Sequence, residues 1–308
     1  MKSVILTLSL THFLISCSHN VSFRSTSGEK SKPIAFNLSL IHTLSSVPTD
    51  GDVHPATLPY YGEYEQTGRK LIYLATRHTS NIESKTHKGI DNIFERFKPE
   101  AVIVEVPPFE GELGEEILNR CDSERCVEGL YAYQKAKRLG INVIGGEPQH
   151  NEVLRVSLKN GLTEEEMIFF YTYRGVASWR QGDPERAYTP KKPIEEIRRY
   201  IKHNKIRLGL EGARFDYKDF VSIYLKNMRT PFDFKKTLYV DIAPYKDGHY
   251  IQKLSVVVDK AREESILKKT ENLINSNNRV FIIYGSGHFL KHRPVLKNAF
   301  ISENVISL

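Results

Sequence analysis

Two histidines and two glutamates stand just beyond short apolar runs of the sequence, where each run gives way to polar residues. These four residues are His78, Glu105, Glu147 and His288. Imidazole nitrogens and carboxylate oxygens bind Mn²⁺, Co²⁺ or Zn²⁺ in proteins, and they also carry protons in hydrolytic reactions. A single histidine is more often a hydrogen-bonded structural residue, so a functional site is expected only if the four side chains meet.

A buried strand is predicted ahead of each of these residues. The apolar runs span residues 70–75, 101–104, 141–144 and 280–284. Strand patterns alternate with helical ones, such as that from Ile90 to Phe97, which indicates an α/β fold with a central, largely parallel sheet and flanking helices. Ligands bind at the carboxyl ends of the strands in such sheets, and the four residues are therefore expected to share one cleft.

A long helix is predicted from about Leu254 to Asn275, and it carries Arg262 beside its buried face. An inward arginine needs a carboxylate or a ligand anion to satisfy its charge. Two roles for Arg262 stay open at this point. It stabilises negative charge that develops in the site, or it forms a structural ion pair with Glu105 or Glu147.

The middle of the chain has a different pattern, with helices that are rich in aromatic residues. Thr163 and Glu166 have the spacing of a capping box, which marks the start of one of these helices. We predict a single α/β domain over residues 35–308 that contains a helical insertion at about 155–250.

The order of these motifs resembles the superfamily that contains TraB/PrgY-type proteins, the Tiki metalloproteases, erythromycin esterases and haem-binding ChaN-like lipoproteins. That group shares a first strand ending in GxxH, a second strand ending in glutamate, a late helix with arginine, and a last strand entering GxxH. Residues 285–288 (GSGH) match the last motif in full, whereas residues 75–78 (ATRH) have Ala75 in place of glycine. The resemblance covers about residues 70–290, and Ser80 and Ser84 favour the Tiki/TraB branch. It implies a three-layer architecture like that of EreA and ChaN.

The Tiki branch implies an envelope hydrolase with a divalent metal, Mn²⁺, Co²⁺ or Zn²⁺. The metal ligands would be His78, Glu105, Glu147 and His288, and the catalytic residues His78, Glu105, Arg262 and His288. The metal would lower the pKa of a bound water, and Arg262 would stabilise the oxyanion that forms. The expected substrate is a peptide or another small molecule, cleaved at a peptide bond, with an ester bond as second choice.

Two alternatives remain open beside the metal-dependent hydrolase. In a metal-independent, esterase-like hydrolase, a histidine oriented by Glu105 activates water itself, and Arg77 beside His78 favours this version if it points into the cleft. In a ChaN-like surface lipoprotein, the fold binds haem or another ligand. The sequence has tyrosines and histidines to offer but no specific haem motif, so this alternative depends on analogy of fold.

The first residues have the pattern of an exported lipoprotein. Lys2 precedes a short apolar run, and residues 14–17 (LISC) resemble a lipobox. We predict a cleaved signal peptide over residues 1–16, a palmitate-bearing lipid anchor on Cys17, and a flexible tether over residues 17–34. Ser18 in place of aspartate indicates sorting to the outer membrane of a bacterial envelope.

Cysteine usage and charge fit this location. Cys121 and Cys126 are predicted to form a disulfide in an oxidising compartment. The net charge of +7 is spread along the chain and no nucleic-acid motif is present, so nucleic acid is not an expected partner. The membrane is expected to be reached through the lipid on Cys17, and the sequence does not indicate an oligomeric state.

We expect Cys17→Ala to release the protein from the membrane fraction or to leave an uncleaved precursor, because the thiol that accepts the lipid is gone. Cell fractionation and migration on a denaturing gel measure this, with Ser27→Ala as the control that keeps the lipobox. A Cys17→Ala protein that fractionates and migrates like the wild type would show that the chain is not a lipoprotein.

Overall fold

The structure is a computed structural model that describes residues 32–43, 58–107, 109, 114, 118–119, 121, 124–179 and 191–308. The chain divides into two units, of which Pro33–Leu308 is compact and carries the described helices and strands. The predicted signal peptide, Cys17 and all but the last residues of the predicted tether lie outside the described residues. Within those residues, no helix is long and apolar enough to cross a membrane.

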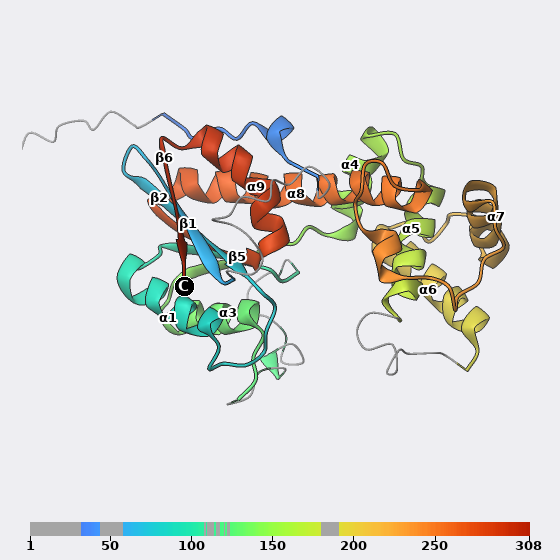
Figure 1. The fold of residues 1–308 in the computed structure, drawn as a ribbon, viewed down its shortest axis with the longest axis horizontal. Coiled ribbons are helices and arrows are strands. Elements are labelled where there is room, and N and C mark those ends of the chain that lie inside the picture. The colour runs from blue at the N-terminus through green and yellow to red at the C-terminus, as the bar shows by residue number, and fades with distance from the viewer. Residues whose placement is uncertain are drawn as a thin grey trace, which may run out of the picture. The chain divides into compact units, whose positions relative to one another are not determined.

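A six-stranded sheet forms the centre of the second unit (Figure 1). Its strands are β1 (Tyr60–Gln66), β2 (Arg69–Thr76), β3 (Ala101–Val104), β4 (Asn142–Gly145), β5 (Arg279–Gly285) and β6 (Ser302–Ser307). Their order across the sheet is β4-β3-β5-β2-β1-β6. The first four run parallel, whereas β1 pairs antiparallel with both β2 and β6. The predicted α/β fold with a largely parallel sheet is therefore confirmed.

Eight α-helices surround or extend this sheet in the described residues. They are α1 (Lys85–Phe97), α3 (Glu128–Arg138), α4 (His150–Lys159), α5 (Glu164–Ser178), α6 (Pro193–Leu208), α7 (Tyr217–Met228), α8 (Tyr250–Ser276) and α9 (Ser286–Ala299). Short 3₁₀ turns lie at Leu38–Leu40 (η1) and Tyr239–Ile242 (η6). Helices α1 and α3 cover one face of the sheet, and α8 and α9 cover the other.

Alternating side chains of the parallel strands belong to two apolar cores, one on each face of the sheet. In β2, Tyr73 packs with residues of α8 and α9, whereas Ile72 and Leu74 pack with α1 and α3. Successive side chains of a strand point to opposite faces, so a strand covered on both faces must be apolar throughout. Each such side chain stabilises the fold by about 1.5–3 kcal/mol when it leaves water.

The long helix α8 joins this sheet to a third core, which α4, α5, α6 and α7 form with each other. Leu254, Val258 and Ala261, in its first half, pack into that helical core. Its second half, with Ile266 and Ile274, packs on the sheet. Residues near position 262 are therefore held between the two packed regions, where polar side chains reach the edge of the sheet.

The predicted elements agree with the structure, while two strands were not predicted. The four predicted strands are β2, β3, β4 and β5, the predicted capping box starts α5, and Cys121 and Cys126 form the predicted disulfide. The antiparallel strands β1 and β6 were not predicted because polar residues interrupt both of them. Such short alternating segments lack the apolar run that marks a buried strand.

We expect Gly146→Ala to lower the free energy of unfolding by about 1–3 kcal/mol, because the site has no room for a methyl group. A Cβ there would overlap the hydroxyl of Tyr284 and lie 2.7 Å from Ile103 Cγ2. Urea titration measures the change. Gly212→Ala is the control, since no atom lies within 4 Å of its Cβ position, and it should leave stability nearly unchanged. Equal stability of the two variants would contradict the packing at Gly146.

Candidate functional site

The four residues predicted at strand ends all lie at the carboxyl edge of the sheet. Glu105 follows β3 directly, and His78 and Glu147 stand two residues beyond β2 and β4. His288 occupies the first turn of α9, which starts immediately after β5. Because β4, β3, β5 and β2 are neighbours in this order, the four side chains come from adjacent strands.

Glu105 is the centre of this group. Its Oε2 accepts a hydrogen bond of 2.8 Å from the backbone N–H of Gly285 and lies 4.0 Å from His78 Nε2. Its Oε1 lies 3.6 Å from His288 Nε2 and 3.5 Å from Arg262 Nη2. Burial raises the pKa of Glu105, but the hydrogen bond and positive charge of His288 outweigh this and lower the pKa to about 2. The carboxylate is therefore ionised.

Gly285 allows this close approach. A Cβ at Gly285 would lie 3.1 Å from His78 Nε2 and 3.5 Å from Glu105 Oε2, so a side chain would crowd the centre of the site. Glycine lets the backbone N–H come near the carboxylate without this obstruction.

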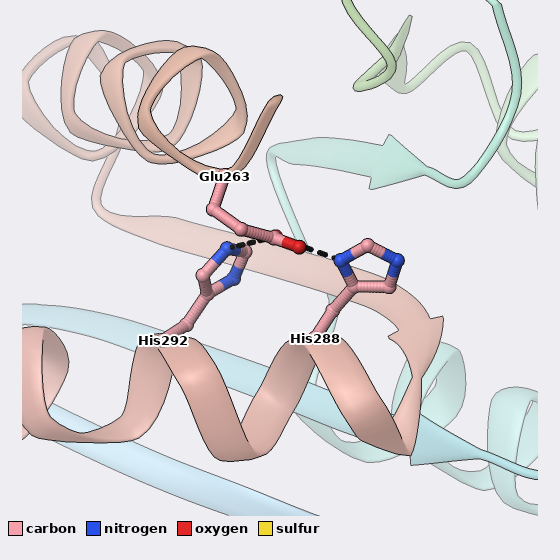
Figure 2. A group of neighbouring side chains, drawn as sticks. All are labelled: Glu263, His288 and His292. Carbon is pink, nitrogen blue, oxygen red and sulfur yellow. Dashed lines mark hydrogen bonds and ion pairs between the residues drawn. The ribbon is translucent and has the colours of Figure 1, made fainter. Parts of the chain in front are cut away.

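The buried carboxylate of Glu263 contacts His288 at Nδ1, on the ring edge away from Glu105 (Figure 2). His288 and His292 lie one turn apart on α9, and both face Glu263 of α8. Oε2 of Glu263 lies 2.7 Å from His288 Nδ1 and 2.8 Å from His292 Nε2. Its Oε1 accepts a hydrogen bond of 3.0 Å from Lys291, which also donates one of 2.6 Å to Asp259. Glu263 is thus fully buried and paired on both oxygens.

These pairings determine the charges of the buried group. Burial lowers the pKa of His288, but the negative charge of Glu263 and the hydrogen bonds to Glu105 and Glu263 raise it to about 9. The pKa of Glu263 lies well below its ordinary value, because the charges of His288 and Lys291 outweigh the effect of burial. Burial keeps the pKa of His292 below its ordinary value. His288 is therefore an imidazolium at neutral pH when no metal is bound.

A second carboxylate holds His78. Oε1 of Glu128, at the start of α3, lies 2.6 Å from His78 Nδ1 and accepts a hydrogen bond of 3.0 Å from Thr76. Its other oxygen accepts the backbone N–H of Thr79. The hydrogen bond to Glu128 raises the pKa of His78. The His78 side chain is 69% exposed, so it stands at the open side of the site, whereas His288 stands at the buried side.

The two histidines share one arrangement. Each is bound through Nδ1 to a buried glutamate, and each has its Nε2 within 4.0 Å of Glu105. A carboxylate on Nδ1 fixes the ring and makes Nε2 more basic, which suits either a metal ligand or a general base. Sequence analysis missed both of these glutamates, Glu128 and Glu263, together with His292 and Lys291.

Glu147 and Arg262 form an ion pair at the border of the group. Arg262 Nε lies 2.6 Å from Glu147 Oε2, and its Nη2 lies 2.7 Å from Oε1. The ion pair left open by the sequence is therefore present, and Arg262 also reaches Glu105 at 3.5 Å. Both oxygens of Glu147 accept short hydrogen bonds from this one guanidinium, so a metal bound by Glu147 would have to compete with Arg262.

Two groups of side chains among the described residues could hold a metal ion. One is Glu263, His288 and His292, and the other is Glu105, Glu147 and His288; in each, the ligand atoms lie within 4.8 Å of one another. The first is fully enclosed and already holds the ammonium of Lys291 at 3.0 Å. A cation there must displace or tolerate this charge, which makes the more open side of His288, facing Glu105, the better place.

Comparison with protein-family models, with curated proteins and with solved structures finds no match to this chain. The resemblance to the TraB, Tiki, erythromycin esterase and ChaN group therefore stays a prediction from the motifs at the strand ends.

The charge on His288 predicts how the stability of the metal-free protein depends on pH. Its pKa is about 9 in the folded state against 6.5 ordinarily, so the folded state keeps a proton that the unfolded state releases. This contribution, roughly 3 kcal/mol, is complete below pH 6.5 and is lost as the pH rises through about 9. Urea unfolding in the presence of a chelator, repeated across this range, measures it.

His288→Gln is the matched variant, and its free energy of unfolding should change much less over the same pH range. Equal slopes for the wild type and His288→Gln would mean that the buried pair with Glu263 does not hold the extra proton.

Proposed function

We propose that this chain is an envelope hydrolase whose centre consists of Glu105, His78 and His288. The observation that carries the proposal is the pair of carboxylate-bound histidines that face one ionised carboxylate from neighbouring strand ends. A structural role alone explains a buried ion pair, but it does not explain why the exposed His78 is held by a second buried glutamate. The favoured substrate bond is a peptide bond, with an ester as the second choice.

A divalent ion such as Mn²⁺, Co²⁺ or Zn²⁺ fits these donors. Nε2 of His288 and the carboxylate of Glu105 would hold it, since with Glu147 they form one of the two groups whose ligand atoms lie within 4.8 Å of one another. His78 is outside that group, with its Nε2 4.0 Å from Glu105, and it would have to come closer to join the ligands. Each histidine already has the carboxylate partner on Nδ1 that is typical of metal-bound imidazole. The ion would supply a bound water of lowered pKa. Its binding would release the proton of His288, since a metal ligand must be neutral imidazole.

The chain's own residues would orient the reaction and stabilise its charges. Glu128 and Glu263 hold the two rings, and the N–H of Gly285 holds Glu105. Arg262 lies 3.5 Å from Glu105 and carries the positive charge that would stabilise an oxyanion. Glu147 keeps that guanidinium in place through two hydrogen bonds.

A metal-free hydrolase is the second candidate, and the unequal exposure of the two histidines favours it. The pKa of His288 is about 9, so this residue keeps its proton at neutral pH, which suits a group that donates a proton to the leaving group. His78 is exposed and lies nearer the entrance, where it can take a proton from water. Both versions use the same three side chains, and they differ in whether an ion is bound and in whether His288 keeps its proton.

The wider assignment follows from the same proposal. We place the chain in the TraB, Tiki, erythromycin esterase and ChaN-like superfamily, nearest the Tiki/TraB branch, with a three-layer architecture of that type. The motifs at residues 75–78 and 285–288, with Glu105 and Arg262, support this assignment. We also propose that the protein is lipid-anchored through Cys17 at the bacterial outer membrane.

We expect His78→Ala, Glu105→Gln and His288→Ala each to lower kcat/KM by about a hundredfold or more, because the three groups act on one reacting centre. Hydrolysis of a peptide mixture and of ester substrates, followed by mass spectrometry, measures this. Glu95→Gln is the control, since Glu95 is exposed on α1 and should leave the activity unchanged.

Elemental analysis of the same preparations separates the two versions. A divalent metal in the wild type that disappears in His288→Ala supports the metal-dependent hydrolase, while activity without metal supports the metal-free one. Wild-type protein that hydrolyses none of these substrates but gives a strong Soret band with haemin would instead favour a haem-binding protein.

A further inference from the structure

A cavity of about 470 Å³ opens next to the candidate site, and its lining is strongly basic. Helices α4, α5 and α6 supply most of its walls. Its charged and titratable lining residues are Arg174, Arg199, Arg207, Arg262, His150, His203 and Glu147. Four arginines therefore face one carboxylate among the described residues that line it.

Two of these arginines lack a carboxylate partner among the described residues. Glu147 is engaged by Arg262, and Arg199 is paired with Glu196 on the same helix. Neither Arg174 nor Arg207 has an ion pair in the part of the chain that the structure describes. Their charges are close together, since both lower the pKa of the same imidazole, His150. Like charges that converge without a counter-charge repel each other and attract an anion.

Packed aromatic side chains form part of the cavity wall near these arginines. Tyr171 packs on His150 with ring centroids 4.9 Å apart. On the next helix, the ring of Tyr200 lies against Gly175, where a Cβ would stand only 3.1 Å from the ring. Burial lowers the pKa of His150 to about 4, and Arg207 and Arg174 add to this effect, so its imidazole stays neutral. It can donate or accept a hydrogen bond without a change in the charge of the cavity.

Arg262 connects the cavity to the candidate centre. It lines the cavity and also lies 3.5 Å from Glu105, and its partner Glu147 lines the cavity as well. A molecule that is bound between Arg174 and Arg207 and extends past Arg262 would reach the side of Glu105.

We propose that this cavity binds an oxyanion, a phosphate or a carboxylate, and that it holds the anionic part of the substrate beside the bond to be cleaved. The planar guanidinium of arginine matches both kinds of oxyanion with paired hydrogen bonds. The binding of the anion stands by itself, whereas its assignment to a substrate rests on the proposed hydrolase. The substrate class is then an anionic peptide or ester with its charge near the scissile bond.

Calorimetric titration of the purified full chain with inorganic phosphate, and separately with succinate, tests the binding. The double variant Arg174→Gln/Arg207→Gln should bind at least tenfold more weakly, because each arginine supplies charge-assisted hydrogen bonds. Arg155→Gln is the matched control, since Arg155 is exposed on α4 and does not line the cavity. Circular dichroism checks that the variants remain folded.

Stronger binding of phosphate than of succinate identifies the ligand class as a phosphate, and the reverse identifies a carboxylate. Absence of saturable binding of both anions, or equal binding by the wild type and the double variant, overturns the proposal. Its failure is distinguishable from failure of the proposed function. Anion binding without any hydrolysis leaves the cavity assigned but rejects the hydrolase. Hydrolysis that is equally fast for neutral and anionic substrates keeps the hydrolase but rejects the cavity as the place for the substrate's charge.

Discussion

The structure around the site depends on one buried carboxylate, that of Glu263. A charge in the interior is costly unless other charges and hydrogen bonds surround it, and here three residues of α9 do so: His288, Lys291 and His292. This pairing holds α9 against α8 at the end of β5. It also determines the direction of His288, whose free nitrogen can then face only Glu105. Arg262, one residue earlier on α8, reaches Glu105 as well.

His78 and Glu128 form a second histidine–glutamate pair of this kind, which differs in its exposure to solvent. Its histidine is largely exposed and its glutamate is buried, whereas both members of the other pair are buried. The two imidazoles therefore meet Glu105 with unequal access to water, although a glutamate on Nδ1 raises the pKa of each. Such a difference is how two groups of one type take opposite roles in proton transfer.

Much of this arrangement could be predicted from the sequence, and the part that could not has a physical reason. The strand-end residues were predictable because parallel strands buried on both faces read as apolar runs, and the residue after each run must lie at one edge. The ion pair of Arg262 was one of two open alternatives, since helical spacing places a residue on a face but does not choose its partner.

Glu128 and Glu263 were missed because charged residues in a helix are mostly solvated. The sequence does not distinguish a buried helical glutamate from an exposed one. Lys291 and His292 were missed for the same reason. The four-residue interval between His288 and His292 was the available signal, since it places both on one face of a helix. That face becomes meaningful only once Glu263, twenty-five residues away from His288 in sequence, is known to lie opposite.

The place of β5 in the sheet has a consequence for how the site comes into being. Strands β2 and β3 do not touch each other, because β5, from residues 279–285, lies between them. As the chain emerges during synthesis, His78 and Glu105 are therefore present long before β5 joins their strands. Contacts of such sequence separation form slowly. The group around Glu105 is thus completed among the last parts of the domain, and a chain that ends before β5 has His78 and Glu105 without the strand that brings them together.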